Sequence, residues 1–467
     1  MPNKSSIIAE MQFEGIHSKN AINTTGARAY TITYQYATTS EPSNFPRPGE
    51  YSGWTPFSAS ERTAFEKALA ELESVINVNF VEVRGQADPV LDVGKIDLTG
   101  TTTGKGGYSS SSIGDTIVSY EAFAVFKNTL NLADGSNTTE NLLLHELGHA
   151  LGLKHPDSPP ALPAAQENNK FTVMSYVANP DNGQRSDGLQ LYDILALQDT
   201  WGEAANNTGD TTYDGPRNDT VYAVWDTGGT DTFTAGDRRN DVSIDLREGK
   251  FSSFDSTDDV VITFGTKIEN ATGGSGNDKL LGNGLGNTLR GAGGNDKLKG
   301  FGGNDRLFGD GGNDKLLGFS QRDVLKGGSG NDTLNGGGAK DKLVGQAGRD
   351  KLLGQNGNDK LFGGKGKDLL KGGDGADLLR GQKGNDKLVG QGGADTIVFK
   401  KNDGQDTFKD FQNGIDEIRF VNLGNVKKIL NNNAEQVGDD VIFDFGNRGS
   451  LTVEDTTIRA VSDDIGL

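Results

Sequence analysis

The sequence contains no cysteine, little proline and few aromatic residues. Its 467 residues include 12 Pro and only 7% Phe, Trp and Tyr. The absence of Cys excludes a disulfide framework, a cysteine-based zinc finger and a catalytic thiolate, and the scarcity of Pro excludes collagen. The sequence contains no run of about 18 apolar residues, which is the length that a helix needs to cross a membrane. A formal net charge of −19 argues against a nucleic-acid partner, which normally requires a basic face.

The N-terminus also lacks a secretory signal. The apolar stretch 5–9 is followed directly by Glu10 and by no cleavage motif, whereas the apolar core of a signal peptide has about 7–15 residues. We therefore expect a chain that is either cytoplasmic or exported by a route that does not read an N-terminal signal. Residues 1–22 are predicted to be an N-terminal extension or a short propeptide.

Glycine, in contrast, is abundant and concentrated in one tract. Of the 68 Gly, 37 lie in 273–398, where the chain divides into fourteen nine-residue units such as GGSGNDKLL. Position eight is always Leu or Ile, and position six is Asp in every unit except at Asn287. A strict nine-residue period with a constant apolar position is typical of a calcium-binding parallel β-roll and not of a flexible linker.

The repeated Asp residues are the predicted calcium ligands. Each carboxylate can supply a hard oxygen ligand between stacked turns, and a buried row of carboxylates requires a cation. We therefore expect several structural Ca²⁺ ions and folding that is coupled to calcium binding. The predicted ligands are Asp278, Asp296, Asp305, Asp314, Asp323, Asp332, Asp341, Asp350, Asp359, Asp368, Asp377, Asp386 and Asp395.

The repeat tract is basic in an otherwise acidic chain. It holds 15 Asp, no Glu and 19 Lys or Arg. We interpret Lys279, Lys297, Lys315 and their equivalents as solubilising residues on the outer faces of the roll. Affinity for anionic glycans is the alternative.

Strand and helix patterns flank the repeats. Upstream, the alternation of side chains predicts strands at 27–37, 78–83 and 90–98, an edge strand at 107–118, and a helix from Ser58 to about Val75. Downstream, short strands are predicted to close the open end of the roll; they lie at 396–399, 417–421, 441–445 and 450–453.

Three of the four histidines lie within eleven residues. Asn137 and Glu140 predict the start of a helix on which His145 and His149, four residues apart, project from the same side and can bind one metal ion. Gly152 lets the chain leave the helix in a left-handed turn and bring His155 back as a third ligand. Three neutral imidazoles leave one coordination position open, as in a catalytic zinc site.

Three further residues belong to the predicted catalytic site. Glu146 follows the first histidine and is expected beside a metal-bound water, where it can act as a general base. Met174 lies in a Met-Ser-Tyr segment that is expected to pack beneath the metal. Tyr176, in the same segment, is predicted to point its phenol at the zinc or at the oxyanion of the reaction.

Other catalytic interpretations fail. The stretch GTTTGK (100–105) is one residue too short for a phosphate-binding loop, and Gly106 stands where such a loop needs Ser or Thr. A Ser-His-Asp hydrolase would require the fourth histidine, His17, which we expect to be an ordinary surface residue.

Several of these motifs resemble the serralysin family of secreted bacterial metalloproteases. The shared segments are HELGHALGLKHP (145–156), MSY (174–176), LYDILALQDTWG (191–202), VWDTGGTDTF (224–233), IENATGGSGND (268–278) and DTFKDF (406–411). The resemblance implies His145, His149 and His155 as ligands of one catalytic Zn²⁺, Glu146 as general base, and Tyr176 as a fifth ligand or transition-state hydrogen-bond donor.

The resemblance also implies a fold. We expect an α+β zincin (metzincin) catalytic domain, followed by an all-β parallel β-roll of nonapeptide (RTX) repeats with a β cap. The predicted boundaries are 1–22 for the extension or propeptide, 23–205 for the metallopeptidase domain, 206–272 for a β-rich join, 273–398 for the roll and 399–467 for the cap and secretion-signal region.

The function implied is that of a secreted, extracellular zinc endopeptidase. Its expected partners are protein or peptide substrates, the type I secretion machinery and a proteinaceous inhibitor, and we expect a monomer with neither a membrane span nor a nucleic-acid partner. A calcium-dependent adhesin or surface-binding protein with an inactive peptidase domain is the alternative. A pore-forming toxin with the same repeats would need long apolar or amphipathic membrane helices, and none is visible.

Overall fold

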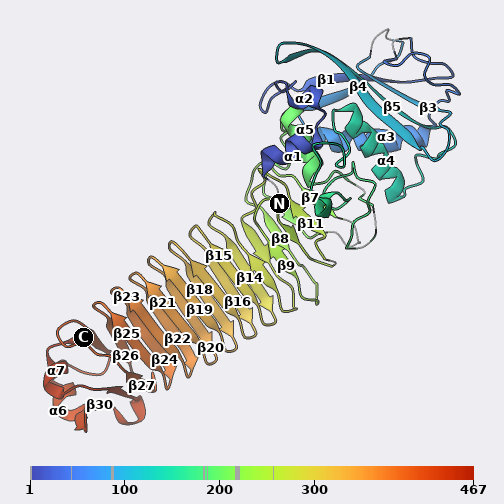
Figure 1. Ribbon diagram of the computed structural model, residues 1–467. Coiled ribbons are helices and arrows are strands. Elements are labelled where there is room, and N and C mark those ends of the chain that lie inside the picture. The colour runs from blue at the N-terminus through green and yellow to red at the C-terminus, as the bar shows by residue number, and fades with distance from the viewer. Residues whose placement is uncertain are drawn as a thin grey trace.

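The computed structural model describes residues 3–43, 45–85, 89–181, 183, 185–186, 188–215, 221–255 and 257–466. The molecule is elongated, with a mixed unit of helices and strands at one end and a long stack of short strands extending from it (Figure 1). Among these residues, no helix has both the length and the apolar composition needed to cross a bilayer.

The N-terminal unit is built on a five-stranded sheet with strand order β2-β1-β3-β5-β4. The first four strands in this order are parallel, whereas β4 lies antiparallel to β5 at the edge of the sheet. Apolar side chains of the sheet and helices form one buried core. The elements are α1 (Lys4–Met11), α2 (Glu14–His17), β1 (Tyr30–Tyr36), α3 (Ala59–Val75), β2 (Val78–Glu82), β3 (Leu91–Ile96), β4 (Gly104–Ile113), β5 (Thr116–Lys127), α4 (Asn137–Ala150), the 3₁₀ turn η1 (Ala164–Gln166) and α5 (Leu191–Trp201).

The sequence prediction for this unit is correct for β1, α3, β2 and β3 but wrong for 107–118. That segment is not one strand, because β4 ends at Ile113 and β5 begins at Thr116 after a turn in which Gly114 has φ +59°. The long strand β5 was not predicted. Its first half is mostly exposed and its second half is continuously buried, so it shows no regular alternation.

Two twelve-stranded sheets form the stack. Pairing is parallel through the repeats, and each strand pairs with the strand eighteen residues further on, so that Leu280 lies opposite Leu298 and Leu298 opposite Leu316. The position-eight side chains are almost completely buried and form a single core between the sheets. This is the arrangement expected of a parallel β-roll with two nonapeptides in each coil.

The strands of the repeat tract are short. They are β13 (Lys279–Leu281), β14 (Thr288–Gly293), β15 (Lys297–Phe301), β16 (Arg306–Gly311), β17 (Lys315–Phe319), β18 (Val324–Ser329), β19 (Thr333–Gly338), β20 (Lys342–Ala347), β21 (Lys351–Asn356), β22 (Lys360–Gly366), β23 (Leu369–Asp374), β24 (Leu378–Gly384), β25 (Lys387–Gly392) and β26 (Thr396–Lys400).

The same two sheets continue on both sides of the repeats. Before the repeats they include β6 (Thr212–Tyr213), β8 (Thr232–Thr234), β9 (Ser243–Asp245) and β12 (Asn270–Thr272), and a separate small sheet is formed by β7 (Tyr222–Val224), β10 (Phe251–Ser252) and β11 (Val260–Ile262).

The C-terminal end is not composed of strands alone. The predicted strands are present, but two helices that were not predicted lie among them. The elements are β27 (Gln405–Phe408), β28 (Glu417–Val421), α6 (Val426–Asn433), β29 (Ala434–Val437), β30 (Asp440–Asp444), the 3₁₀ turn η2 (Gly446–Arg448), β31 (Ser450–Val453), α7 (Ile458–Ser462) and β32 (Ile465–Gly466).

Candidate metal centre

Helix α4 carries two of the three clustered histidines beneath the edge strand β4. Its N-cap is Ser136, whose side chain accepts a hydrogen bond from the backbone of Thr139; the helix start predicted from Asn137 is therefore one residue late. Strand β4 approaches the helix closely, because a Cβ atom at Gly104 or Gly106 would collide with Glu146. These two glycines were not predicted as part of the site.

The structure brings the three predicted histidines together. The Nε2 atom of His155 lies 3.1 Å from that of His145 and 2.9 Å from that of His149. All three can offer a nitrogen to one common point, since their candidate ligand atoms lie within 4.8 Å of one another. Gly152, with φ +104°, makes the predicted left-handed turn after the helix.

Backbone carbonyls fix the tautomers of two of these rings. His145 Nδ1 lies 2.9 Å from the carbonyl oxygen of Val173, and His149 Nδ1 lies 2.8 Å from that of Leu153. A carbonyl oxygen only accepts hydrogen bonds, so both Nδ1 atoms carry the proton and both Nε2 atoms present a lone pair. His155 can donate one proton to only one of these lone pairs, whereas a single divalent cation would satisfy all three nitrogens.

Burial keeps the three rings uncharged. It lowers the pKa of His145 to about 4 and that of His149 to about 3, and it also lowers the pKa of His155. The neutral imidazole is the form that binds metals, so the donor set fits Zn²⁺.

Glu146 lies beside the histidines with its side chain almost completely buried. Burial raises the pKa of this carboxyl to about 8, so it accepts a proton far more readily than an exposed Glu does. A carboxyl with a pKa near neutrality suits a general acid-base catalyst.

The Met-Ser-Tyr segment lies against the same site. Met174 is fully buried, and its sulfur occupies the space that a side chain at Gly148 of α4 would need. The ring centroid of Tyr176 lies 4.7 Å from that of His155 and 5.3 Å from that of His145. Although Tyr176 is 64% exposed, partial desolvation and the nearby Glu146 raise the pKa of its phenol, so the phenol stays protonated and can donate a hydrogen bond.

A pocket of about 550 Å³ opens beside His145, Glu146 and Tyr176. Leu130, Leu132 and Leu142 contribute an apolar wall, and Arg185 brings a guanidinium group. A larger pocket of about 730 Å³ lies elsewhere, around Tyr36 and Arg62, and none of the histidines lines it.

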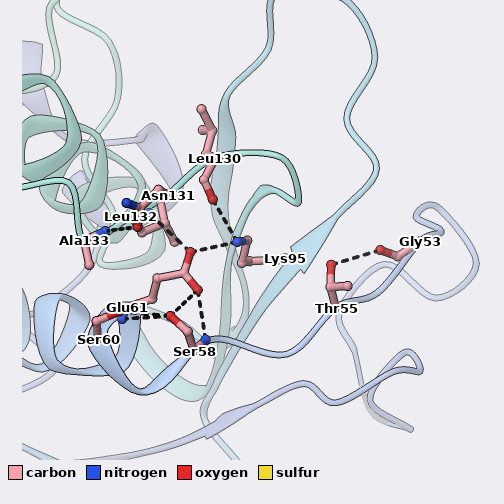
Figure 2. A network of polar contacts seen from close by, with 10 residues as sticks. All are labelled: Gly53, Thr55, Ser58, Ser60, Glu61, Lys95, Leu130, Asn131, Leu132 and Ala133. Carbon is pink, nitrogen blue, oxygen red and sulfur yellow. Dashed lines mark hydrogen bonds and ion pairs between the residues drawn. The ribbon is translucent and has the colours of Figure 1, made fainter.

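A buried ion pair holds the wall of the 550 Å³ pocket (Figure 2). Lys95 Nζ donates to Glu61 Oε1 over 2.7 Å and to the carbonyl oxygen of Leu130 over 2.8 Å, while the backbone amide of Leu132 donates to the same Glu61 oxygen over 3.3 Å. Both charged side chains are more than nine-tenths buried. Removing one partner would therefore leave an uncompensated charge next to the pocket wall.

Asp193 supports the metal centre and was not predicted. Its carboxylate accepts hydrogen bonds from Thr172 Oγ1 over 2.6 Å and from the amides of Val173 and Gln190 over 2.8 and 3.0 Å. It thereby holds the amide of Val173, the residue whose carbonyl oxygen accepts from His145. A single acidic residue in helix α5 gives no sequence signal for this role. His17, by contrast, is exposed, as predicted.

The predicted calcium-binding Asp residues form two buried ladders along the roll. In each ladder Oδ1 accepts a hydrogen bond from the backbone amide of the position-six residue one coil earlier, for example from Asp296 to Asp314 over 2.8 Å. In twelve of the thirteen, Oδ2 is buried without a hydrogen-bond partner. The exception is Asp278, whose Oδ2 accepts from the amide of Gly274 over 2.6 Å.

These unpartnered oxygens fit a hard cation. A Cβ atom at Gly291 would collide with Asp296 Oδ2 and would come close to the carbonyl oxygen of Gly309 in the next coil, so glycine leaves two oxygens exposed to the same small space. Burial raises the pKa of Asp296 to about 7, which shows how poorly the ionised form is solvated without a cation. The ladders continue to Asp406 and Asp416 beyond the repeats, and neither residue was predicted.

Comparison with known proteins identifies relatives. Residues 201–459 match the family model described as peptidase M10 serralysin C terminal. The chain is 30% identical over 299 residues to serralysin of Photorhabdus laumondii subsp. laumondii (56% of this chain, 60% of the relative) and 30% identical over 282 residues to serralysin of Proteus mirabilis (50% and 56%). It is 28% identical over 296 residues to metallopeptidase AprA of Pseudomonas marginalis (55% and 61%).

The extent of these matches is limited. The chain spans about 60% of the length of the curated relatives that it matches. An extracellular lipase LipA from Serratia marcescens, of known structure, gives a TM-score of only 0.17 at 17% identity over 44% of each chain, and this likeness supports no inference. The family model, however, covers more than half of the chain. The chain therefore belongs to the peptidase M10 serralysin C-terminal family.

Proposed function

We propose that the protein is a secreted zinc endopeptidase whose peptidase unit corresponds to residues 23–205. The observation that carries the proposal is the convergence of three neutral imidazoles beside the buried carboxyl of Glu146. Relatives named serralysin and metallopeptidase AprA support it. An α+β metzincin fold is the corresponding assignment for the N-terminal unit.

His145, His149 and His155 would hold the zinc ion. When bound, zinc supplies Lewis acidity, which polarises a carbonyl group and lowers the pKa of water. The hydrogen bonds to the carbonyls of Val173 and Leu153 orient the two helical imidazoles and make them more basic ligands.

Glu146 is the proposed general acid-base group. Its carboxylate takes a proton from the attacking water and passes it to the leaving amine. Tyr176 donates a hydrogen bond from its phenol to the developing oxyanion or serves as a fifth ligand, and a contact that strengthens in the transition state accelerates the reaction.

The edge strand β4 is the proposed binding site for the substrate backbone. It pairs with β5 on one side only, and its residues Gly104 and Gly106 lie directly against Glu146. An extended peptide could add to this edge as a further strand, with one side chain entering the pocket lined by Leu142 and Arg185.

The roll is proposed to bind several Ca²⁺ ions through its Asp ladders, stabilising the chain and directing its export. We assign residues 206–272 to the join, 273–398 to the RTX roll and 399–467 to the cap and secretion-signal region, and we assign residues 1–22 to an N-terminal extension or short propeptide. Type I secretion machinery and a proteinaceous inhibitor are the proposed partners of the extracellular, monomeric enzyme.

A metal-exchange assay tests this function. Purified protein is assayed on an unfolded protein such as casein before and after removal of zinc with phenanthroline, and again after zinc is returned. We expect hydrolysis to disappear and then recover in step with zinc content. An intact, zinc-loaded protein that hydrolyses no unfolded substrate would instead favour the adhesin alternative.

A further inference from the structure

The N-terminal segment makes an unusual contact with the turn that follows helix α4. Gln12 and Leu153 form an isolated antiparallel β-bridge. Its two hydrogen bonds run from the amide of Phe13 to the carbonyl oxygen of Gly152 over 3.1 Å, and from the amide of Lys154 to the carbonyl oxygen of Met11 over 2.9 Å. The bridge therefore holds the peptide groups on both sides of Leu153.

Leu153 is the residue whose carbonyl orients a proposed metal ligand. Its oxygen lies 2.8 Å from His149 Nδ1, and the ring of Phe13 lies against that of His149, with centroids 6.2 Å apart. Ile16, also from the N-terminal segment, occupies the space beside Gly152 that a side chain would need. Met11, Phe13 and Ile16 thus contact either the turn or the ring of His149.

The segment is itself firmly anchored. Gln12 is almost completely buried. Its side-chain Nε2 donates to the carbonyl oxygen of Ala196 over 2.8 Å and to Thr200 Oγ1 over 3.0 Å, both in α5. Ile7 and Met11 are fully buried in the same core as α5, and α1 and α5 lie side by side (Figure 1). This packing against α5 fixes the position of the segment and therefore the position of the β-bridge.

We infer that residues Met11–Phe13 are a positioning clamp that fixes the carbonyl of Leu153 and thereby the imidazole of His149 in its metal-binding orientation. This inference rests on the proposed zinc site. It makes residues 3–17 a structural support of the proposed peptidase unit. Partners that orient a ligand in this way typically contribute about 10–100-fold to metal affinity.

The substitution Phe13→Pro tests the clamp directly. Phe13 has φ −62° and the preceding Gln12 has φ −99° and ψ 147°, values that proline and its predecessor both adopt without strain. The substitution removes the amide that donates to Gly152 and also removes the aromatic ring. Phe13→Ala removes the ring alone, so the difference between the two variants isolates the backbone hydrogen bond.

Two readouts decide the outcome. In metal-free protein, we expect the His149 Nδ1 proton signal in NMR spectra to broaden or exchange faster in Phe13→Pro than in Phe13→Ala. In zinc titrations against a competing chelator, we expect about tenfold weaker binding in Phe13→Pro than in Phe13→Ala. Ser5→Ala, at an exposed position of α1 away from the turn, should leave both readouts at the wild-type values.

The inference is overturned if Phe13→Pro retains wild-type zinc affinity and an unchanged His149 signal, or if Ser5→Ala weakens zinc binding equally. Should Phe13→Pro fail to fold, Gln12→Ala, which releases the segment from α5, is judged by the same two criteria. A wild-type protein that binds no zinc would refute the proposed function, while the NMR signal of the metal-free protein would still test the clamp.

Discussion

The metal centre and the roll both gather polar atoms that a cation would satisfy, but they do so in different ways. At the metal centre, three nitrogens from one short segment converge on a single point. In the roll, twelve carboxylate oxygens are left without partners, one in each of twelve nine-residue units. In our proposal, one arrangement produces a single reactive site, whereas the other produces a structural requirement for cations along the whole roll.

The supports of the two sites differ as well. His145 and His149 depend on carbonyls of Val173 and Leu153, which are in turn held by Asp193 and by the N-terminal segment. From Asp296 onward, each Asp of the roll accepts from the backbone amide of the equivalent residue one coil earlier. Changes at the metal centre should therefore abolish chemistry with little effect on the roll, whereas loss of calcium should act first on the roll.

The largest expected effect is that of Glu146→Gln. This substitution removes the proton acceptor while keeping the size of the side chain, so we expect hydrolysis to fall about 10²–10⁴-fold. Zinc content and the calcium-dependent unfolding of the roll should not change. The control is Glu140→Gln, on the same helix but ion-paired with Lys67. Casein hydrolysis that survives Glu146→Gln would refute the role assigned to this residue.

Removal of calcium should affect the roll. In calcium-free buffer at about pH 8 that still contains zinc, we expect the β-sheet signal of the roll in circular dichroism to be lost, because its carboxylates are then ionised and buried without counterions. Added Ca²⁺ should restore the signal cooperatively. Mg²⁺ at the same concentration should not, because it demands a smaller octahedral site. A roll that remains fully folded without calcium would contradict the account of the ladders.

The pH dependence of the roll should change sign with calcium. Burial raises the pKa of Asp323 to about 7 and that of Asp341 to about 8, compared with about 3.9 in an unfolded chain. The calcium-free folded roll therefore binds protons more tightly than the unfolded chain does, and its free energy of unfolding should fall as the pH rises from about 4 to about 8.

Calorimetry between pH 5.5 and 7.5 checks this sign. Without calcium, acidification should raise the midpoint of the roll transition. In saturating calcium, acidification should lower it, because protons then compete with Ca²⁺ for the same oxygens. If acidification shifts the midpoint in the same direction in both buffers, the Asp ladders are not the calcium sites.

The smallest expected effect is that of Asn287→Asp, which restores the regular repeat. Asn287 Nδ2 donates to the carbonyl oxygen of Glu269 over 3.0 Å and to Asn283 Oδ1 over 3.1 Å, and a carboxylate would lose both hydrogen bonds. We expect calcium-free stability to fall by about 1–3 kcal/mol, with part of the loss recovered in calcium. Asn277→Asp, at an exposed turn position, serves as the control in urea unfolding.

The fold of the roll was predictable because its information is local. The units repeat a turn glycine, an inward Leu or Ile and, in all but one, a ladder Asp, so the period alone indicates strand length, the buried face and the eighteen-residue register. The convergence of the three histidines was predictable for a similar reason, since their spacing lies on one helix and the turn that follows it.

The supports of the metal centre were not predictable from sequence. Gly104, Asp193 and Gln12 lie 42, 47 and 134 positions from Glu146, and each acts through one close approach or a few hydrogen bonds that no local pattern records. Strand β5 was missed for a related reason, because burial of its second half on both faces hides the alternation of side chains. These supports are long-range tertiary contacts, which local sequence patterns do not indicate.

The most direct test is to determine the metal and its ligands in the protein as purified. Elemental analysis combined with zinc X-ray absorption spectroscopy should show one zinc per chain, bound by three imidazole nitrogens at about 2.0–2.1 Å, and His149→Ala should remove one of them. A protein that contains no zinc when isolated and binds none when it is supplied would contradict the account, as would zinc held by ligands other than His145, His149 and His155.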